Sequence, residues 1–119
     1  MSLDPLARFD DGIVLEAARL PALTWRAEAR PSRDYTVFVH LLDPAGRLVG
    51  QDDRPPVDGS YPTSIWEPGE AILDEHPLAA PPGRYRVVVG MYDPATGQRL
   101  RRVDGGGDSA EVGTLEIKE

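Results

Sequence analysis

The sequence of 119 residues contains no cysteine. Disulfide bonds, thiolate zinc sites, iron–sulfur clusters and cysteine nucleophiles are therefore excluded. Basic residues are also few: 13 Lys and Arg stand against 20 Asp and Glu, so the net charge is −7 at pH 7. Nucleic acids and anionic membrane surfaces are bound through a basic face. The charge balance therefore argues against either of them as a partner.

Long apolar runs are missing as well. The longest nearly apolar segment covers residues 87–92, far short of the roughly 20 residues that a membrane-spanning helix needs. We therefore expect no direct membrane insertion. Residues 1–5 contain neither the basic segment nor the apolar stretch of a signal peptide. Two interpretations fit: a small cytoplasmic protein, or a domain of a longer chain whose signal or membrane part lies outside this sequence.

No window of the sequence has the pattern of an amphipathic helix of three turns. Glycine and proline occur 12 times each, well above their average usage, which predicts many turns. Leu, Ile, Val and Phe together supply 28 residues, enough to argue against disorder. We expect one domain over residues 1–119, with poorly ordered ends at residues 1–11 and 118–119.

Strand-like alternation of apolar and polar residues is the dominant pattern. Residues 23–29 alternate cleanly, as in a sheet with one wet face. Residues 35–42 and 85–92 are rich in β-branched and aromatic residues on both faces, which favours positions at the middle of a sheet. Weaker strands are predicted at residues 12–19, 47–52, 70–78, 98–103 and 111–117. Shared parity predicts an inter-sheet core of Leu23, Trp25, Val37, Val39, Leu41, Tyr85, Val87, Val89 and Met91.

Turn residues connect these strands in pairs. The segments Asp43-Pro44-Ala45-Gly46 and Asp93-Pro94-Ala95-Thr96-Gly97 both combine a proline with a glycine that can adopt positive φ, which predicts two hairpin turns. Residues 53–69 form a long loop with four prolines, as expected for a crossover between sheets. The segment Pro82-Gly83-Arg84-Tyr85 is typical of a tyrosine corner. We therefore predict an all-β, immunoglobulin-like Greek-key β-sandwich of seven or eight strands.

Groups that could perform catalysis are scarce. His40 and His76 are the only histidines, and the sequence has no nucleophile elbow of the Gly-x-Ser-x-Gly type. His40 lies within a predicted strand, where a satisfied or half-exposed sheet histidine is expected. Asp74 and His76 share one face of a strand, which favours a surface hydrogen bond over a catalytic pair. We therefore predict that the chain is not an enzyme.

Several aspartates could supply hard oxygen ligands for a cation. Asp52 and Asp53 stand where the long loop begins, Asp58 lies within it, and Asp104 and Asp108 flank three consecutive glycines. Their spacing matches neither the EF-hand loop nor the nonapeptide calcium repeat. Acidic and glycine residues are common at hairpin tips without any metal. We therefore predict neither a metal site nor another cofactor.

The long loop could instead bind a saccharide. Proteins hold sugars by stacking a ring face on Trp or Tyr, while polar side chains meet the hydroxyl groups. Tyr61 and Trp66 share the 53–69 loop with Asp58 and Thr63, and these four residues are the candidate ligand-binding set. The alternative is that Trp66 plugs the open end of the sandwich and Tyr61 packs on the prolines. We favour the plug.

Four blocks of the sequence resemble a known kind of domain. They are Asp34-Tyr-Thr-Val-Phe-Val-His-Leu-Leu-Asp43, Tyr61-Pro-Thr-Ser-x-Trp66-x-Pro-Gly-Glu70, Pro82-Gly83-x-Tyr85, and Gly90-x-Tyr92-Asp93-x-x-Thr-Gly97-x-Arg99-Leu100. Together they resemble the extracytoplasmic C-terminal β-sandwich domain of bacterial multi-pass membrane glycosyltransferases of the dolichyl-phosphate-mannose-protein mannosyltransferase type, and of related membrane proteins. The Tyr-Pro-Thr-Ser-x-Trp block is the most specific of the four.

The resemblance implies a non-catalytic accessory domain located outside the cytoplasm. Its partner would be the remainder of the parent membrane protein, whose membrane-embedded part holds the catalytic residues. None of those catalytic residues matches a position in this sequence. A carbohydrate-binding module that functions on its own, with a saccharide as its partner, is the alternative function. A likeness of fold does not identify a ligand.

Overall fold

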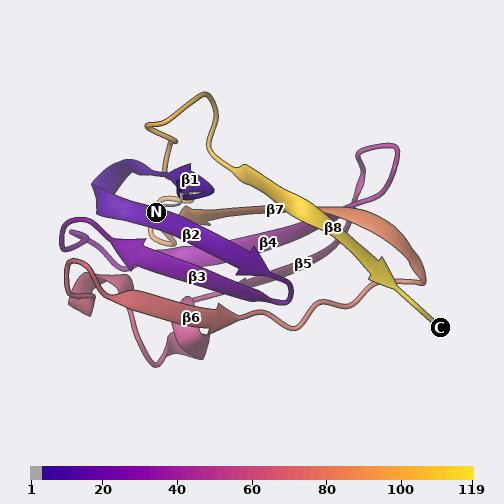
Figure 1. Cartoon of the computed structure of the whole chain (residues 1–119), viewed down its shortest axis with the longest axis horizontal. Helices are drawn as coiled ribbons and strands as arrows, with labels where there is room; N and C mark the ends of the chain where they lie inside the picture. The colour runs from indigo at the N-terminus through magenta and orange to yellow at the C-terminus, as the bar shows by residue number, and fades with distance from the viewer. Residues whose placement is uncertain (1–3) are drawn as a thin grey trace.

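The structure is a computed structural model and describes residues 4–119. It consists of two antiparallel four-stranded sheets packed face to face (Figure 1). The first sheet has the order β1-β2-β3-β6, with β1 at Ala7–Arg8, β2 at Ile13–Arg19, β3 at Ala22–Ala27 and β6 at Ala71–Glu75. The second has the order β5-β4-β7-β8, with β5 at Leu48–Arg54, β4 at Thr36–Leu42, β7 at Gly83–Tyr92 and β8 at Ala110–Ile117. Short 3-10 helices occupy Asp10–Gly12 (η1), Pro56–Gly59 (η2) and Thr63–Ile65 (η3).

The inward faces of the two sheets form one hydrophobic core. All nine residues predicted from alternation to form this core are buried, so that prediction is confirmed. In β3 the alternation is complete, because Leu23, Trp25 and Ala27 are buried while the residues between them are partly exposed. The pattern ends before Ala29, which is exposed in the connection that follows β3. The residue period of two thus determined which side chains reach the core.

The strands predicted for the middle of a sheet occupy that position. β4 pairs with both β5 and β7, and β7 pairs with both β4 and β8. Phe38 on β4 points away from the inter-sheet core yet is only 1% exposed. Its ring lies over Gly90 of β7 and beneath the guanidinium of Arg99, which is 4.2 Å from the ring centroid. The ring of Phe38, on the outer face of β4, is therefore shielded by Arg99 and packs against Gly90.

One of the predicted strands was wrong. Residues 98–103 form no strand and make only isolated bridges, between Tyr92 and Arg99 and between Phe9 and Arg102. The segment 1–11, predicted to be poorly ordered, includes β1, which pairs with β2, and Phe9, which is 2% exposed. Phe9 contacts Trp25, with ring centroids 6.3 Å apart, so burial of its ring holds this segment in place. Residues 1–3 lie outside the described residues.

Both predicted turns are formed, and both use the same device. In the first, Asp43 Oδ1 accepts hydrogen bonds from the backbone of Ala45 and Arg47, and Gly46 has φ of +86°. In the second, Asp93 Oδ1 accepts a hydrogen bond from the backbone of Ala95. In both turns, the carboxylate of the first aspartate therefore accepts hydrogen bonds from backbone N–H groups later in the turn.

The strand registers bring four irregular segments to one end of the molecule. β4 begins where β7 ends, with Thr36 opposite Tyr92, and β2 begins where β3 ends, with Ile13 opposite Ala27. The segments at this end, which we call the loop end, are residues 10–12, 28–35, 55–70 and 93–109, on the left in Figure 1. No helix in residues 4–119 has the length and apolarity needed to cross a membrane.

Candidate functional site

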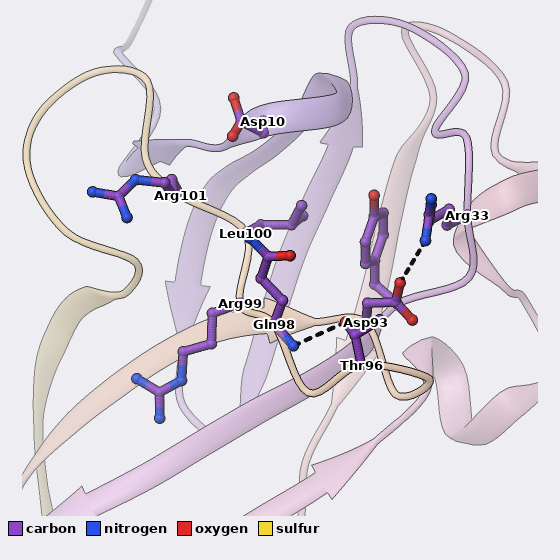
Figure 2. Close-up of a pocket in the computed structure, with 9 residues that line it drawn as sticks. Asp10, Arg33, Asp93, Thr96, Gln98, Arg99, Leu100 and Arg101 are labelled. Atoms are coloured by element: carbon purple, nitrogen blue, oxygen red, sulfur yellow. Dashed lines mark hydrogen bonds and ion pairs between the residues drawn. The ribbon is translucent and has the colours of Figure 1, made fainter.

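A pocket of about 250 Å³ opens at the loop end (Figure 2). Three segments build it: η1, the connection between β3 and β4, and the segment that follows β7. Figure 2 shows Arg99 and Arg101 on one side of the pocket and Arg33 with Asp93 on the other, with Gln98 between them. The full lining is Asp10, Arg33, Tyr35, Asp93, Thr96, Gln98, Arg99, Leu100 and Arg101.

Arg33 is held at one side of the pocket by an ion pair. Its Nη1 lies 2.9 Å from Oδ2 of Asp93, a side chain that is only 13% exposed. Asp93 is the first residue of the second turn, so its position is set by the turn itself. The backbone N–H of Ala95 and the guanidinium of Arg33 both hold the pKa of Asp93 below its usual value. The carboxylate therefore stays charged and orients Arg33 over a wide pH range.

The two arginines on the other side differ in how they are held. The Arg99 guanidinium lies over the ring of Phe38, and its Nη1 is 3.4 Å from Oδ1 of Asp108. Arg101 is exposed, and among residues 4–119 its guanidinium has no ion-pair partner. Asp10 is also exposed and is joined to Arg101 only through the backbone, by a hydrogen bond of 2.9 Å from Asp10 N to Arg101 O. One guanidinium and one carboxylate that line this pocket, those of Arg101 and Asp10, thus have no ion-pair partner within residues 4–119.

Tyr35 forms the inner wall of the pocket and is fixed by η1. Its hydroxyl donates a 2.6 Å hydrogen bond to Oδ2 of Asp11, which also accepts from the backbone N–H and the hydroxyl of Ser32. Asp11 has a positive φ of 61°, which aspartate tolerates better than most residues. Burial and the Asp11 carboxylate raise the pKa of Tyr35 to about 12. The phenol therefore stays neutral and acts as a structural donor.

The remaining polar groups at the pocket are uncharged. The Thr96 hydroxyl oxygen accepts a hydrogen bond of 3.1 Å from the backbone N–H of Gln98, which leaves its proton available for donation. The Gln98 amide offers both a donor and an acceptor. The pocket contains no histidine, and its serine and threonine content is limited to Thr96. This lining is suited to binding a polar molecule through hydrogen bonds and ion pairs.

Two of the predicted ligand-binding residues are buried in the structure. Trp66 is 0% exposed, and its indole Nε1 donates a 2.9 Å hydrogen bond to the carbonyl of Tyr61. Thr63 is also 0% exposed, because its hydroxyl bonds to the carbonyl of Arg33 while accepting from the backbone N–H of Tyr35. Trp66 belongs to the core cluster, as the plug interpretation expected. Its ring face is not available for stacking on a sugar.

The other two predicted ligand-binding residues, Tyr61 and Asp58, lie closer to solvent. Tyr61 is partly buried against the core, and its hydroxyl donates to Oε1 of Glu70. Asp58 is exposed and lies in η2, where its Oδ1 is 3.4 Å from Nη1 of Arg54. η2 borders β6, and a second pocket of about 240 Å³ there is lined by Val57, Asp58, Leu73 and Glu75. Of the four residues proposed from the sequence, Trp66 and Thr63 are thus buried, while Tyr61 and Asp58 contact different partners.

Asp74 and His76 pair as their shared strand face predicted, but the pair is not at the surface. Both side chains are 0% exposed, and Nε2 of His76 lies 2.6 Å from Oδ2 of Asp74. Asp74 also accepts hydrogen bonds from the indole of Trp25 and from the backbone N–H of Val57. Along β6 every second residue is buried, and Asp74 is one of these residues. The polar residues of the segment gave no sign of this burial. His40 is half-buried, as expected, and burial lowers its pKa.

No cluster of three or more His, Asp or Glu side chains in residues 4–119 has an arrangement that could hold a metal ion. The glycine-rich segment near the C-terminus uses its aspartates for other contacts. Asp104 accepts hydrogen bonds from the backbone of Arg8 and from the guanidinium of Arg102. Asp104 thereby ties the last long connection to β1.

The pocket at the loop end was not identified from the sequence. Its residues come from three segments that are far apart in the chain, and none of those segments carries a recognisable ligand-binding pattern. The available signal was the cluster of three arginines at positions 99, 101 and 102 in a chain with a net charge of −7. Comparisons of the chain with known protein families, with curated proteins and with solved structures found no match.

Proposed function

We propose that this chain is a non-catalytic, extracytoplasmic accessory domain of a larger bacterial membrane protein of the glycosyltransferase type, and that the loop end is its binding surface. The observation that carries the binding role is the meeting of three of the four loop-end segments around one polar pocket. Binding residues are commonly placed on loops that a rigid scaffold positions. The two sheets provide that scaffold, because the core is continuous between them.

We also infer that the fold is an immunoglobulin-like Greek key. The strand pairing supports it: β3 lies beside β6, and β4, β7 and β8 are consecutive neighbours, as in the ABE and CFG sets of that fold. A second observation is the hydroxyl of Tyr85, which donates to the carbonyl of Pro81 just ahead of β7. This is the bond that defines a tyrosine corner. In immunoglobulin variable domains, the loops at the corresponding end carry the binding residues.

The lining of the pocket supports binding without chemistry. A nucleophile needs an adjacent base, and the carboxylate of Asp11, which accepts from the hydroxyls of both Tyr35 and Ser32, is committed to holding η1 in place. The buried pair Asp74 and His76 has no access to a substrate. A domain of this type would position a partner or substrate beside an active site located elsewhere in the parent protein.

The reading frame that encodes this chain tests the proposed context. The expected result is an adjoining in-frame segment with about eight or more membrane-spanning helices. Each of these is recognised as a run of roughly 20 apolar residues. A complete frame of 119 residues would overturn the proposal. In the parent protein, deletion of the domain should raise the KM for the acceptor and leave turnover at saturating substrate largely unchanged. Loss of all turnover in a correctly folded deletion variant would contradict the non-catalytic role.

A further inference from the structure

We infer that the pocket at the loop end binds a single acidic sugar, meaning a monosaccharide that carries one carboxylate or phosphate group. The inference deepens the proposed binding role of the loop end and rests on it. It is argued from the size of the pocket, from the charges at its opening and from the hydrogen-bonding groups that remain unused.

Size limits the ligand first. Pockets for drug-sized molecules typically enclose about 300–1,000 Å³, whereas this pocket encloses about 250 Å³. One sugar ring fits such a volume better than an oligosaccharide does. The position of the pocket at the junction of η1 with two connections also closes it on the side of the core, where Tyr35 and Leu100 are buried.

Charge determines the anionic part. Three guanidinium groups surround the pocket, and two of them already have carboxylate neighbours, Asp93 beside Arg33 and Asp108 beside Arg99. Arg101 has no such neighbour among the described residues. A guanidinium recognises carboxylate and phosphate groups through paired N–H donors. Arg101 is therefore the guanidinium that remains to bind an anionic group, while Asp10 remains as an acceptor for hydroxyl groups.

The neutral and acidic groups determine the sugar part. Asp10 can only accept hydrogen bonds, and it would repel a small anion that has no donors of its own. Gln98 and Thr96 can each donate and accept. A ligand that satisfies all of these groups has several hydroxyl groups as well as one negative charge. An acidic sugar has both, whereas inorganic phosphate and acetate lack the ring of hydroxyls and a neutral hexose lacks the charge.

We expect weak binding, because Arg101 and Arg99 are exposed and must lose side-chain freedom when they close on the ligand. A dissociation constant of about 1 mM is the expected order of magnitude. The test is a titration of the isotope-labelled chain, followed by the backbone amide signals of residues 96–101 and the side-chain amide of Gln98. Signals of residues 43–47, at the opposite end of the sandwich, serve as the internal reference.

Two acidic probes distinguish the sources of the negative charge: glucuronate carries a carboxylate and glucose 6-phosphate carries a phosphate. Saturable shifts with either one, confined to residues 96–101 and the facing segments, support the inference and identify the anionic group. Glucose, acetate and inorganic phosphate are the controls. Equal binding of acetate or phosphate would overturn the sugar requirement, and equal binding of glucose would overturn the need for a charge. No shift with any probe at tens of millimolar would overturn the site.

Arg101→Gln should weaken binding of the acidic sugar about tenfold, because it removes the unpaired guanidinium while keeping a polar side chain. Arg19→Gln is the matched control: Arg19 is an exposed arginine at the end of β2, opposite the loop end. It should bind with unchanged affinity and melt at the same temperature as Arg101→Gln. Equal affinity of the two variants would overturn the role of Arg101. Failure of all sugar binding would leave the reading-frame test of the proposed function unaffected, so the two failures can be told apart.

Discussion

Nε2 of His76 lies 2.6 Å from Oδ2 of Asp74, and neither side chain reaches solvent. The other ring nitrogen, Nδ1, lies 2.8 Å from Oδ2 of Asp52. Asp74 belongs to β6 of the first sheet and Asp52 to β5 of the second, so the imidazole links the edges of the two sheets. Burial alone would lower the pKa of His76, but the two carboxylates outweigh it and the net pKa is raised.

This link predicts a specific dependence of stability on pH. Because the folded-state pKa of His76 lies above the ordinary value of about 6.5, its contribution to stability is fully present below that pH. The contribution is lost as the pH rises through the folded-state pKa. Urea unfolding of the wild type should therefore show a loss of stability on the alkaline side of about pH 6.5 that His76→Gln does not share. His40 is present in both proteins, so its opposite contribution cancels in the difference. Equal pH profiles would contradict the prediction.

Removal of the Tyr85 hydroxyl should destabilise the fold. Its hydrogen bond to the carbonyl of Pro81 is made by a side chain that is only 6% exposed, so Tyr85→Phe leaves that carbonyl without this partner. The expected loss is about 1 kcal/mol in the free energy of unfolding. Tyr61→Phe is the control, since the partner of Tyr61 is the side chain of Glu70 in a more open setting. A smaller loss for Tyr85→Phe than for Tyr61→Phe would remove the argument for a tyrosine corner.

Trp66 should behave as a core residue. Its ring is fully buried, so Trp66→Ala should cost about 3–5 kcal/mol of unfolding free energy. The neighbouring Ile65 is 49% exposed, and Ile65→Ala should therefore cost much less. Chemical denaturation of both variants measures the difference. In the wild type, the indole N–H signal of Trp66 should also stay in place when neutral sugars are added. Comparable losses for the two variants would show that Trp66 is not a plug.

The close contact between Gly90 and Phe38 predicts a position that tolerates no side chain. A Cβ at residue 90 would lie 2.4 Å from Cζ of Phe38, so Gly90→Ala should cost about 1–3 kcal/mol. Gly105→Ala is the control, because a Cβ there would meet nothing within 4 Å. In a Phe38→Leu background, the cost of Gly90→Ala should fall, since the smaller side chain removes the clash. Equal costs of Gly90→Ala in both backgrounds would show that the ring is not the obstacle.

Local patterns in the sequence determined a large part of the fold. The period of two placed Leu23 and Trp25 in the core, and β-branched residues on both faces placed β4 and β7 at the middle of their sheet. Aspartate, proline and glycine determined the two turns, because each turn is completed within five residues. These features depend on neighbours in the chain, which is why sequence reasoning could find them.

Other features were decided only when distant segments met. Residues 98–103 form isolated bridges to two different partners, Tyr92 and Phe9, in place of the predicted strand. The link among Asp52, Asp74 and His76 needs both sheets, and burial turned a predicted surface pair into a buried one. The pocket with Arg33 and Arg101 needs three connections brought together by the registers of six strands. Contacts between distant segments are determined by which strands pair and in which register. Alternation and turn residues do not specify that pairing.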